Sequence, residues 1–449
     1  MSDKKIKWIC IEPLTGGMYL GTEKAVGHPA EFILGFPGFA TVEYNKNDDT
    51  IKTAGNEYHL LKYLESVGRL PEYKLLNKDP FAPGPVDNVE IINDEHWSTD
   101  KDISFEGIDL VTAVPFCSGL SMATTSATSK EKIDSRNCNM EWLAEYVLYN
   151  IKPKVYIFEN APGLFTSRGE HVRSGLEAQA KKYGYSIAYY KTDTKLHGVP
   201  QMRPRTFVLF IKWRNENGEN CPDMQFIAEK CKVFSEFISE IPNDCTQRDE
   251  YCPMNELSKS AIEYLTSLYG KDWRTPVITQ AKGHISQFIR NNNLEQGFID
   301  YVTNNKDEKQ IEQTKHYFKH IHEKEAIGKG YYETMTHIGV KDLAPAIIFK
   351  NMFTYMHPTE DRLLSMREGL HMMGHPDDFI LYGTDPDKCR KIGQNVPVNT
   401  ARWIVSEAVR IINDWDTIER AHSGNVAFFD NTKQTKNFII ETPEIPFED

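Results

Sequence analysis

The sequence predicts an α/β protein with a doubly wound, mainly parallel sheet and a second, smaller domain. Three observations lead to this prediction. Short apolar runs alternate with segments of helical spacing over the first 213 residues. After Trp213 the pattern becomes irregular, beginning with a polar, turn-rich stretch at residues 215–220. An amphipathic helical segment returns at residues 401–412, and we expect it to complete the first domain.

The expected elements follow in chain order. We predict strands at residues 7–11, 107–114, 154–158 and 206–212, and helices at residues 140–149, 174–183 and 401–412. Gly184 is a plausible C-cap of the second helix, because glycine readily adopts the left-handed conformation that often ends a helix. Ligands of parallel sheets bind at the carboxyl ends of the strands. Residues that follow the predicted strands are therefore the first candidates for a site.

The domain boundaries follow the same changes in pattern. The first domain is predicted at residues 1–213 and is completed by residues 385–421. Residues 214–384 form the second domain. Residues 422–449 are polar and acid-biased, so we expect a peripheral C-terminal tail.

The composition is that of a soluble globular protein, and it excludes several classes. The 449 residues include 64 Asp and Glu against 52 Lys and Arg, which gives a formal net charge of −12. No apolar run approaches the ~18 residues of a membrane span, and no apolar signal segment follows the charged N-terminus. Eight cysteines are too sparse for a disulfide scaffold, so we expect free thiols in a reducing cytoplasm. The charge balance argues against bulk electrostatic binding of nucleic acid and leaves local basic surfaces open.

The sharpest local signal lies after the strand predicted at residues 107–114. Cys117 follows that strand and precedes a loop rich in Gly, Ser and Thr. A thiol at the carboxyl end of a strand is well placed to act as a nucleophile on this architecture. The alternative is a buried structural cysteine, since cysteine is among the most buried residue types.

Two further segments are expected at the same edge of the sheet. Glu159 follows the third predicted strand, where apolar surroundings would raise its pKa toward the range of a proton donor near neutrality. Gln201, Arg203 and Arg205 alternate before the fourth strand, so an extended chain would place them on one face. Two guanidinium groups beside a thiol and a carboxyl could hold an anionic or carbonyl-bearing substrate. The plainer alternatives are a strand-end acid that caps the next segment and a solvated edge.

The order of these segments resembles that of the C5-cytosine DNA methyltransferase family. The matching segments are Pro115-Phe116-Cys117 for the Pro-Cys nucleophile motif, Glu159-Asn160-Ala161 for Glu-Asn-Val, residues 201–205 for Gln-x-Arg-x-Arg, residues 362–370 and 374–378 for the ninth motif, and residues 393–397 for the tenth. They cover most of the chain and stand in the family's order. The resemblance implies a Rossmann-like fold of S-adenosylmethionine-dependent methyltransferases, with residues 214–384 as a target-recognition domain.

The resemblance also implies a site for S-adenosylmethionine and no metal. The cofactor-binding residues expected from it are Gly16, Gly17, Glu57, Asp102, Pro115, Gln394 and Asn395. Glycines after the first strand would let the backbone approach the ligand closely, although Leu14 stands where the family has its first glycine. For the ribose-binding acid, Glu57 is preferred if residues 28–54 contain an insertion, and Glu43 is the competitor. Asp102 would hold the adenine amine.

The chemistry implied by the resemblance is covalent catalysis on a cytosine flipped out of duplex DNA. Cys117 would attack C6 of the base, which activates C5 for methylation. Glu159 would bond N3 and the exocyclic amine. Arg205, with Arg203 behind or beside it, would stabilise O2 as negative charge develops.

The loop after the nucleophile is expected to close over DNA as a lid. Ser118 and Ser121 belong to this loop, and Gln201 is a further expected DNA contact. Ser118, Ala161 and Gln394 depart from the residues usual in the family. These departures leave the catalytic types intact and leave the preferences for substrate and cofactor open.

Charged and histidine-rich segments complete the expectations. A basic cleft on an acidic body, with salt-sensitive binding of double-stranded DNA, is predicted from Lys195, Arg203, Arg205, Lys212 and Arg214. His316, His320 and His322 lie close together, but no Cys or carboxylate arrangement beside them supports a metal site.

Three functions follow from these observations. The first is a DNA cytosine-5 methyltransferase that acts as a monomer in the cytoplasm of a bacterial or phage-infected cell. The second is a tRNA cytosine-5 methyltransferase, against which the long region from Trp213 to Arg362 argues. The third is a catalytically inactive DNA-binding relative, against which the intact Cys117, Glu159 and Arg205 argue. The recognition sequence stays open, as does the choice between restriction–modification, phage self-modification and an orphan role.

Overall fold

The computed structural model describes residues 5–36, 40–45, 50–75, 90–91, 103–115, 120, 138–214, 222, 224–225, 228–326, 337–338, 343–347, 352, 354–417 and 425–432. The structural statements below concern these residues. None of their helices is both long and apolar enough to cross a membrane.

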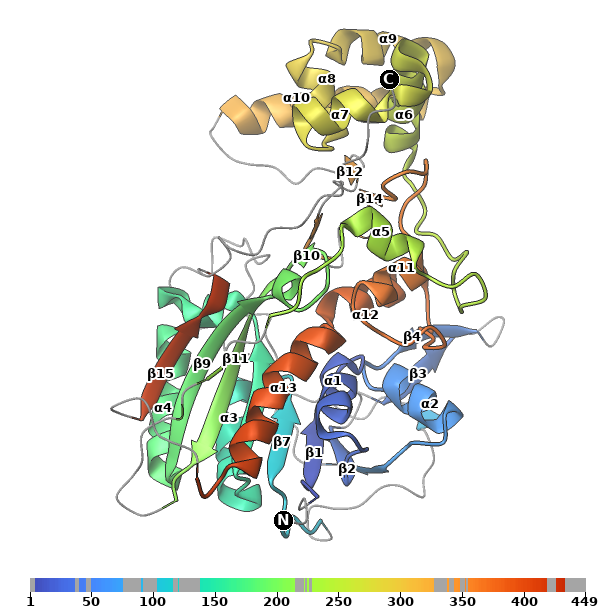
Figure 1. Cartoon of the computed structure of the whole chain (residues 1–449). Helices are drawn as coiled ribbons and strands as arrows, with labels where there is room; N and C mark the ends of the chain where they lie inside the picture. Colours follow the sequence, from blue (N-terminus) through green and yellow to red (C-terminus); the bar gives the residue numbers. More distant parts are fainter. Residues whose placement is uncertain are drawn as a thin grey trace, which may run out of the picture.

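An eight-stranded sheet forms the centre of the larger part of the molecule (Figure 1). In spatial order its strands are β15 (Val426–Asp430), β9 (Tyr185–Asp193), β11 (Pro204–Lys212), β8 (Val155–Asn160), β7 (Leu110–Ala113), β1 (Trp8–Ile11), β2 (Phe32–Gly35) and β5 (Glu72–Leu75). Strand β11 is antiparallel to both of its neighbours, and the other pairs are parallel. The apolar runs predicted as strands correspond to β1, β7, β8 and β11. The predicted mainly parallel sheet is therefore confirmed.

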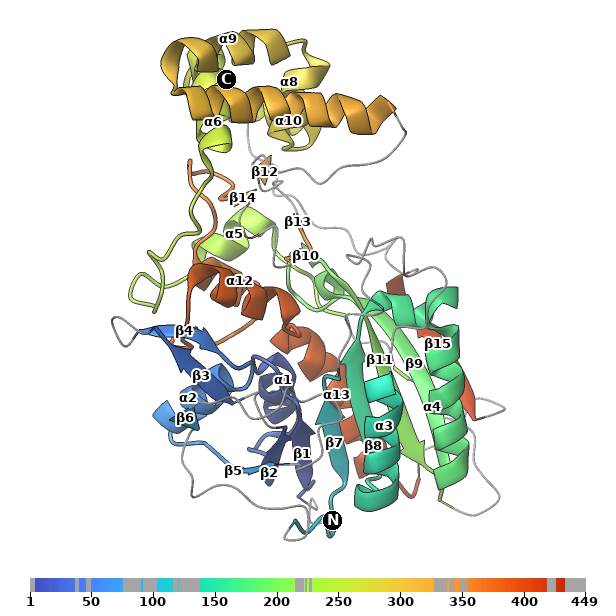
Figure 2. The ribbon, with the colours of Figure 1, turned by 180° about the vertical axis from the view of Figure 1, so that it is seen from behind.

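Helices cover both faces of this sheet (Figures 1 and 2). The helices α1 (Gly17–Val26), α2 (Tyr58–Ser66) and α13 (Val398–Asn413) contribute to one apolar core, and α3 (Cys138–Tyr146) and α4 (Glu170–Tyr183) contribute to the other. Successive strand residues point to opposite faces, so Leu110 joins the first core and Val111 the second. Gly184 ends α4 at φ 77° as expected, and its N–H bonds to the carbonyl of Ala180.

The second part of the molecule is the helical lobe, residues 256–326, which stands apart from the sheet (Figures 1 and 2). It consists of α6 (Glu256–Tyr269), α7 (Arg274–Ala281), α8 (Ile285–Asn291), α9 (Glu295–Asn305) and α10 (Glu308–Ala326). Trp273, Phe298 and Phe318 are buried within it. Between the lobe and the sheet lie α5 (Phe234–Ser239), α11 (Met366–His371) and α12 (Asp385–Gln394). The lobe lies within the range 214–384 that is predicted for the second domain.

Short strands occur outside the main sheet. Strands β3 (Thr41–Tyr44), β4 (Ile51–Ala54) and β6 (Glu90–Ile91) form a small antiparallel sheet, whereas β10 (Gln201–Met202) pairs with β13 (Ala344–Pro345) and β12 (His337–Ile338) pairs with β14 (Tyr355–Met356). The β3–β4 hairpin lies in the chain between β2 and α2. A hairpin at this place agrees with the insertion that the preference for Glu57 requires.

The expectation of a wholly peripheral tail at residues 422–449 is wrong for one segment. Val426–Asp430 forms β15, which pairs in parallel with β9 at the edge of the main sheet. Phe428 stacks on Tyr189 with ring centroids 4.9 Å apart. A backbone ladder and an aromatic cross-strand pair hold this strand, although the acid-rich composition around it suggested otherwise.

Candidate active site

The candidate site lies at the carboxyl ends of β7 and β8. These strands are parallel, with Ala113 opposite Phe158, so the residues that follow β7 lie beside Glu159 at the end of β8. Pro115 is buried after β7. The expected nucleophile, the lid serines and the expected adenine-binding acid lie outside the described residues; these are Cys117, Ser118, Ser121 and Asp102.

A buried acid and a guanidinium meet at this edge of the sheet. Nε of Arg205 lies 2.7 Å from Oε1 of Glu159, and the two side chains are only 16% and 4% exposed. Burial raises the pKa of Glu159, while the charges of Arg205 and Arg203 oppose the rise. The raised pKa agrees with the expectation from the sequence. A carboxyl whose pKa is raised holds a proton more readily than an exposed one.

The other Arg of this segment has a different position. The guanidinium of Arg203 is fully buried and donates to the backbone carbonyls of Ile347, Gly393 and Asn395. The Gln201 side chain is also buried; it donates to the carbonyl of Met372 and accepts from the N–H of Ile347. These two side chains therefore join distant chain segments behind Arg205. Gln201 does not occupy the exposed position that the expected DNA contact requires.

The prediction of a basic cleft is wrong for three of its five residues: Arg203 is fully buried, and Lys212 and Arg214 lie far from Arg205. Arg205 and Lys212 stand at opposite ends of β11, roughly 24 Å apart at about 3.4 Å per strand residue. Arg214 donates to the carbonyls of Trp415 and Asp416 beyond that far end. These residues lie close together in sequence, but the nine-residue strand β11 places Arg205 at one of its ends and Lys212 and Arg214 at the other.

The glycine turn after β1 packs against the segment before α13. Gly16 has φ 105°, and a Cβ there would lie 2.7 Å from Leu60 of α2. A Cβ at Gly17 would overlap the carbonyl oxygen of Val396, so the turn requires glycine at this approach. Leu14 adopts φ 51°, a left-handed conformation in which glycine is favoured. The family's first glycine would fit this backbone better than leucine does.

Asn395 connects that turn to the end of α12. Its side-chain oxygen accepts from the N–H groups of Gly17 and Val396, each at 3.0 Å. Its amide faces Nε2 of His375. Burial lowers the pKa of His375 to about 3, so the imidazole is neutral and can accept from the Asn395 amide. Gln394, by contrast, is exposed at the end of α12.

Glu57 lies at the start of α2 and is buried. The hydroxyl of Tyr73 donates to its Oε2, and Oε1 has no hydrogen-bond partner among the described residues. Burial raises the pKa of Glu57 to about 8. A Cβ at Gly35, the last residue of β2, would overlap the Tyr73 hydroxyl. An unpaired buried carboxyl oxygen on a side chain that lies beside Gly35, at the end of β2, fits the hydroxyl of a ribose, which favours Glu57 as the cofactor acid.

The competing acid has a different environment. Glu43 lies on the β3–β4 hairpin, its side chain is 57% exposed, and it pairs with Lys52 at 2.7 Å and Thr53 at 2.9 Å.

Tyr73 and His375 are the supporting residues that sequence reasoning missed. Tyr73 carried no signal, whereas His375 lies within the Gly-His-Pro segment of the ninth motif.

The histidines of the helical lobe do not assemble a metal site in the described part of the chain. His316 and His320 stack one turn apart on α10, with ring centroids separated by 6.3 Å. His322 pairs with Glu295 at 3.0 Å instead. No group of three or more His, Cys, Asp or Glu positioned for a metal occurs among the residues that the structure covers.

Comparisons with known proteins agree with this geometry. The sequence model of the C-5 cytosine-specific DNA methylases matches residues 86–410. A type II methyltransferase of Bacillus paralicheniformis is 23% identical over 363 residues, which cover 75% of this chain and 77% of the relative. A Methanocaldococcus jannaschii protein assigned as a type II methyltransferase is 21% identical over 336 residues, which cover 73% and 84%.

The fold has a solved counterpart. A prophage-encoded protein of E. coli, described as a DNA modification methyltransferase, superposes with a TM-score of 0.50 at 16% identity, over 91% of this chain and 99% of that one. At this identity the likeness concerns the fold alone. The family match covers well over half of the sequence and includes Glu159, Arg205 and Asn395. The chain therefore belongs to the C-5 cytosine-specific DNA methylase family and is a DNA methyltransferase.

Proposed function

We propose that the protein transfers a methyl group to C5 of a cytosine flipped out of duplex DNA, through a covalent adduct of Cys117. The observation that carries this proposal is the buried Glu159–Arg205 pair, which lies beside the strand that leads to Cys117. The names of the type II relatives support DNA as the substrate and a role in restriction–modification.

The residues would act on the base in a defined order. The Cys117 thiolate forms a bond to C6, and the electrons of the C5–C6 double bond move toward C5, N3 and O2. Glu159 in its protonated form shares a proton with N3, and Arg205 stabilises the charge on O2. After C5 has been methylated, a base removes the C5 proton. The sulfur–C6 bond then breaks, and the thiolate leaves as the double bond re-forms.

The expected cofactor is S-adenosylmethionine, which supplies an electrophilic methyl group when bound. Glu57 would accept hydrogen bonds from its ribose, and the turn at Gly16 and Gly17 would face it. Asn395 holds this turn in place, and Arg203 holds Asn395 through its carbonyl. Arg203 therefore has a positioning role in this proposal, and Arg205 is the guanidinium that would touch the base.

The proposed domains follow the sequence-based division with β15 added to the catalytic part. Residues 1–213 and 385–421 would form the catalytic domain, and the helical lobe would be the core of the target-recognition domain. The lobe stands away from the sheet (Figure 2), which supports this division. Two bodies on either side of a duplex can hold DNA while a base is flipped, so a monomer suffices.

Transfer of a labelled methyl group to duplex DNA and to tRNA tests the proposal. We expect label in DNA, and a denaturation-resistant complex with duplex DNA that contains 5-fluorocytosine. Cys117→Ala should abolish both signals. Label in tRNA alone would establish the RNA-directed alternative, and no complex on any DNA would support the inactive relative. Bisulfite sequencing of DNA from expressing cells would then report the recognition sequence.

A further inference from the structure

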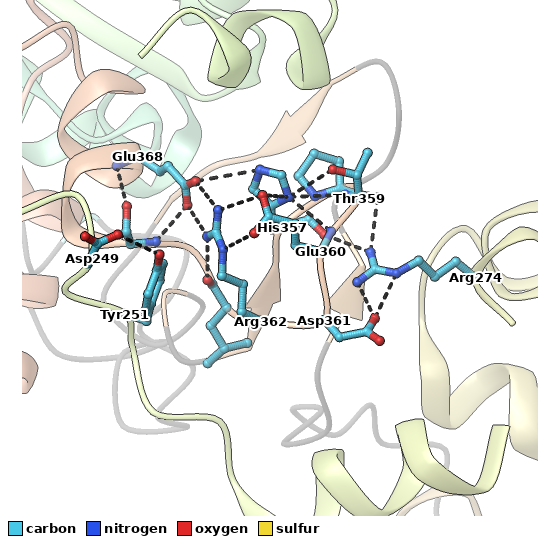
Figure 3. Close-up of polar contacts among 12 residues, drawn as sticks. Asp249, Tyr251, Arg274, His357, Thr359, Glu360, Asp361, Arg362 and Glu368 are labelled. Atoms are coloured by element: carbon cyan, nitrogen blue, oxygen red, sulfur yellow. Dashed lines mark hydrogen bonds and ion pairs between the residues drawn. The ribbon is translucent and has the colours of Figure 1, made fainter. Parts of the chain in front are cut away.

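Arg274 of the helical lobe makes hydrogen bonds and an ion pair with the loop at residues 357–361 (Figure 3). Arg274 is the first residue of α7, and its Nε and Nη2 lie 3.1 and 2.7 Å from Oδ1 of Asp361. Its Nη1 donates to the carbonyls of His357 at 2.9 Å and Pro358 at 3.1 Å. The guanidinium also lies over the ring of Trp273, which is buried in the lobe core, at 5.3 Å. These contacts fix both the distance and the direction of the fork-shaped group.

A second arginine joins the same loop to helix α11, which lies between the lobe and the sheet (Figure 3). Arg362 donates from both terminal nitrogens to the two oxygens of Glu368, at 2.9 and 2.8 Å. Its Nε donates to Glu360 at 2.7 Å, and its Cζ lies over the Tyr251 ring, 4.7 Å from the ring centroid. Glu368 belongs to the capping box of α11, where it accepts from the N–H of Ser365. The loop is thereby bound to the N-terminus of α11.

Helix α11 continues to the groups that support the active site. Met372, directly after α11, accepts from the Gln201 side chain, and Met373 accepts from the N–H of Val398 at the start of α13. His375 then faces Asn395, which holds the glycine turn. A continuous series of contacts thus runs from the lobe core to the cofactor side of the sheet.

We propose that Arg274, Asp361 and Arg362 form a latch that sets the orientation of the helical lobe for duplex DNA. The proposal rests on the proposed function, because it assumes that the lobe engages the DNA. Arg274 acts through residues 357–361, so it is a positioning residue. The buried apolar residues of the lobe belong to the same core cluster as Tyr355, Met356 and Leu363, so apolar packing already keeps the lobe beside this loop. Apolar packing is not directional, and the directed polar contacts of Arg274 and Arg362 would limit the remaining rotation, which otherwise adds an entropic cost to each binding event.

Asp361→Ala tests the latch, because the latch and general electrostatics predict changes of opposite sign in the KM for DNA. Removal of an acid makes the protein less negative, so general electrostatics predicts a lower KM for DNA. Loss of the latch predicts a KM for DNA that rises by about threefold or more, with kcat and the KM for S-adenosylmethionine changed less than about twofold. Asp361→Asn keeps an oxygen acceptor for Arg274 and should recover part of the loss.

Glu263→Gln is the matched control. It removes the charge of Glu263, whose carboxylate lies 2.6 Å from the Lys306 ammonium in an ion pair wholly within the lobe. The Glu263 side chain is 47% exposed, against 58% for Asp361. Because this variant also loses one negative charge but keeps the latch, we expect an unchanged or slightly lower KM for DNA. An equal rise in both variants, or an unchanged or lower KM in Asp361→Ala, would overturn the latch.

Hydrogen exchange separates this proposal from the proposed function. Asp361→Ala should speed amide exchange at residues 354–361 and at the start of α7, with α13 unchanged. This readout needs no substrate. If wild-type protein transfers no methyl group to DNA, the proposed function fails. Unaltered exchange at residues 354–361 would reject the latch in either case.

Discussion

Binding of S-adenosylmethionine should tighten as the pH rises toward 8, because the buried Glu57 must lose a proton to accept the ribose hydroxyls. Burial raises the pKa of this carboxyl to about 8, and the hydrogen bond from Tyr73 opposes the rise. One carboxyl oxygen already accepts from Tyr73, and the other has no partner in the described structure. The ribose would therefore meet an acid that is mostly protonated at neutral pH.

The size of the effect follows from the pKa. With a pKa near 8, about 1% of Glu57 is ionised at pH 6 and half at pH 8, so the dissociation constant should fall roughly fiftyfold between these values. Isothermal titration calorimetry at pH 6, 7 and 8, in buffers of different ionisation enthalpy, measures the affinity and the released proton together. A dissociation constant that does not change with pH, with no proton release, would refute the reasoning.

Two variants locate the effect. Glu57→Gln should bind weakly and with no pH dependence over this range. Glu43→Gln is the matched control, because Glu43 is exposed and already paired with Lys52 and Thr53. We expect wild-type binding from this variant. A pH dependence abolished by Glu43→Gln instead would identify the competing acid as the ribose ligand.

The same carboxyl should affect the stability of the free protein. The folded-state pKa of Glu57 lies above the value of 4.5 expected in the unfolded chain, so its favourable contribution is complete below pH 4.5 and is lost as the pH rises through 8. The loss approaches roughly 5 kcal/mol at full ionisation. Urea unfolding between pH 5 and 9 should show a decline that is absent in Glu57→Gln.

Three further substitutions test the supporting geometry. Glu159→Gln should lower kcat by about 10²–10³-fold with nearly unchanged DNA binding, because it removes the proton shared with N3; an unchanged single-turnover rate would contradict its role. Arg203→Ala should lower the free energy of unfolding by about 3 kcal/mol, since it leaves buried carbonyls without a donor, and thermal unfolding measures this. A loss of kcat at unchanged stability would instead make Arg203 a substrate contact. Gly17→Ala should weaken cofactor binding by about 1–3 kcal/mol, because the methyl group would overlap the carbonyl of Val396; calorimetry that finds wild-type affinity would show that the turn can move.

The core of the fold was predictable because it depends on local patterns. Apolar runs of strand length define β1, β7, β8 and β11, and the intervening helical spacing implies parallel pairing. Parallel strands bring their carboxyl ends together, so a residue after β7 and Glu159 after β8 had to be neighbours. Strand β11 pairs with β8 in the antiparallel sense and begins where β8 ends, so Arg205 at its start lies beside Glu159.

Long-range packing was not predictable from the same patterns. Alternation suggested a shared face for Gln201, Arg203 and Arg205, but Arg203 finds its partners in segments 144–192 residues away. The short apolar run at residues 426–429 does not show by itself that it joins the main sheet, because its ladder partner β9 is distant in sequence. Tyr73 likewise becomes relevant only through its contact with Glu57.

The sequence by itself determined the fold class, the family and the types of residue that can carry the chemistry. Periodicity and strand-end position are local properties, so they can be recognised in the sequence without coordinates. Only the tertiary structure decided which charged groups pair at the strand ends and which support the scaffold. A side chain's role depends on burial and on partners distant in sequence: Glu159 and Arg205 meet across two strands, Arg203 supports the chain behind them, and Arg274 holds a separate lobe.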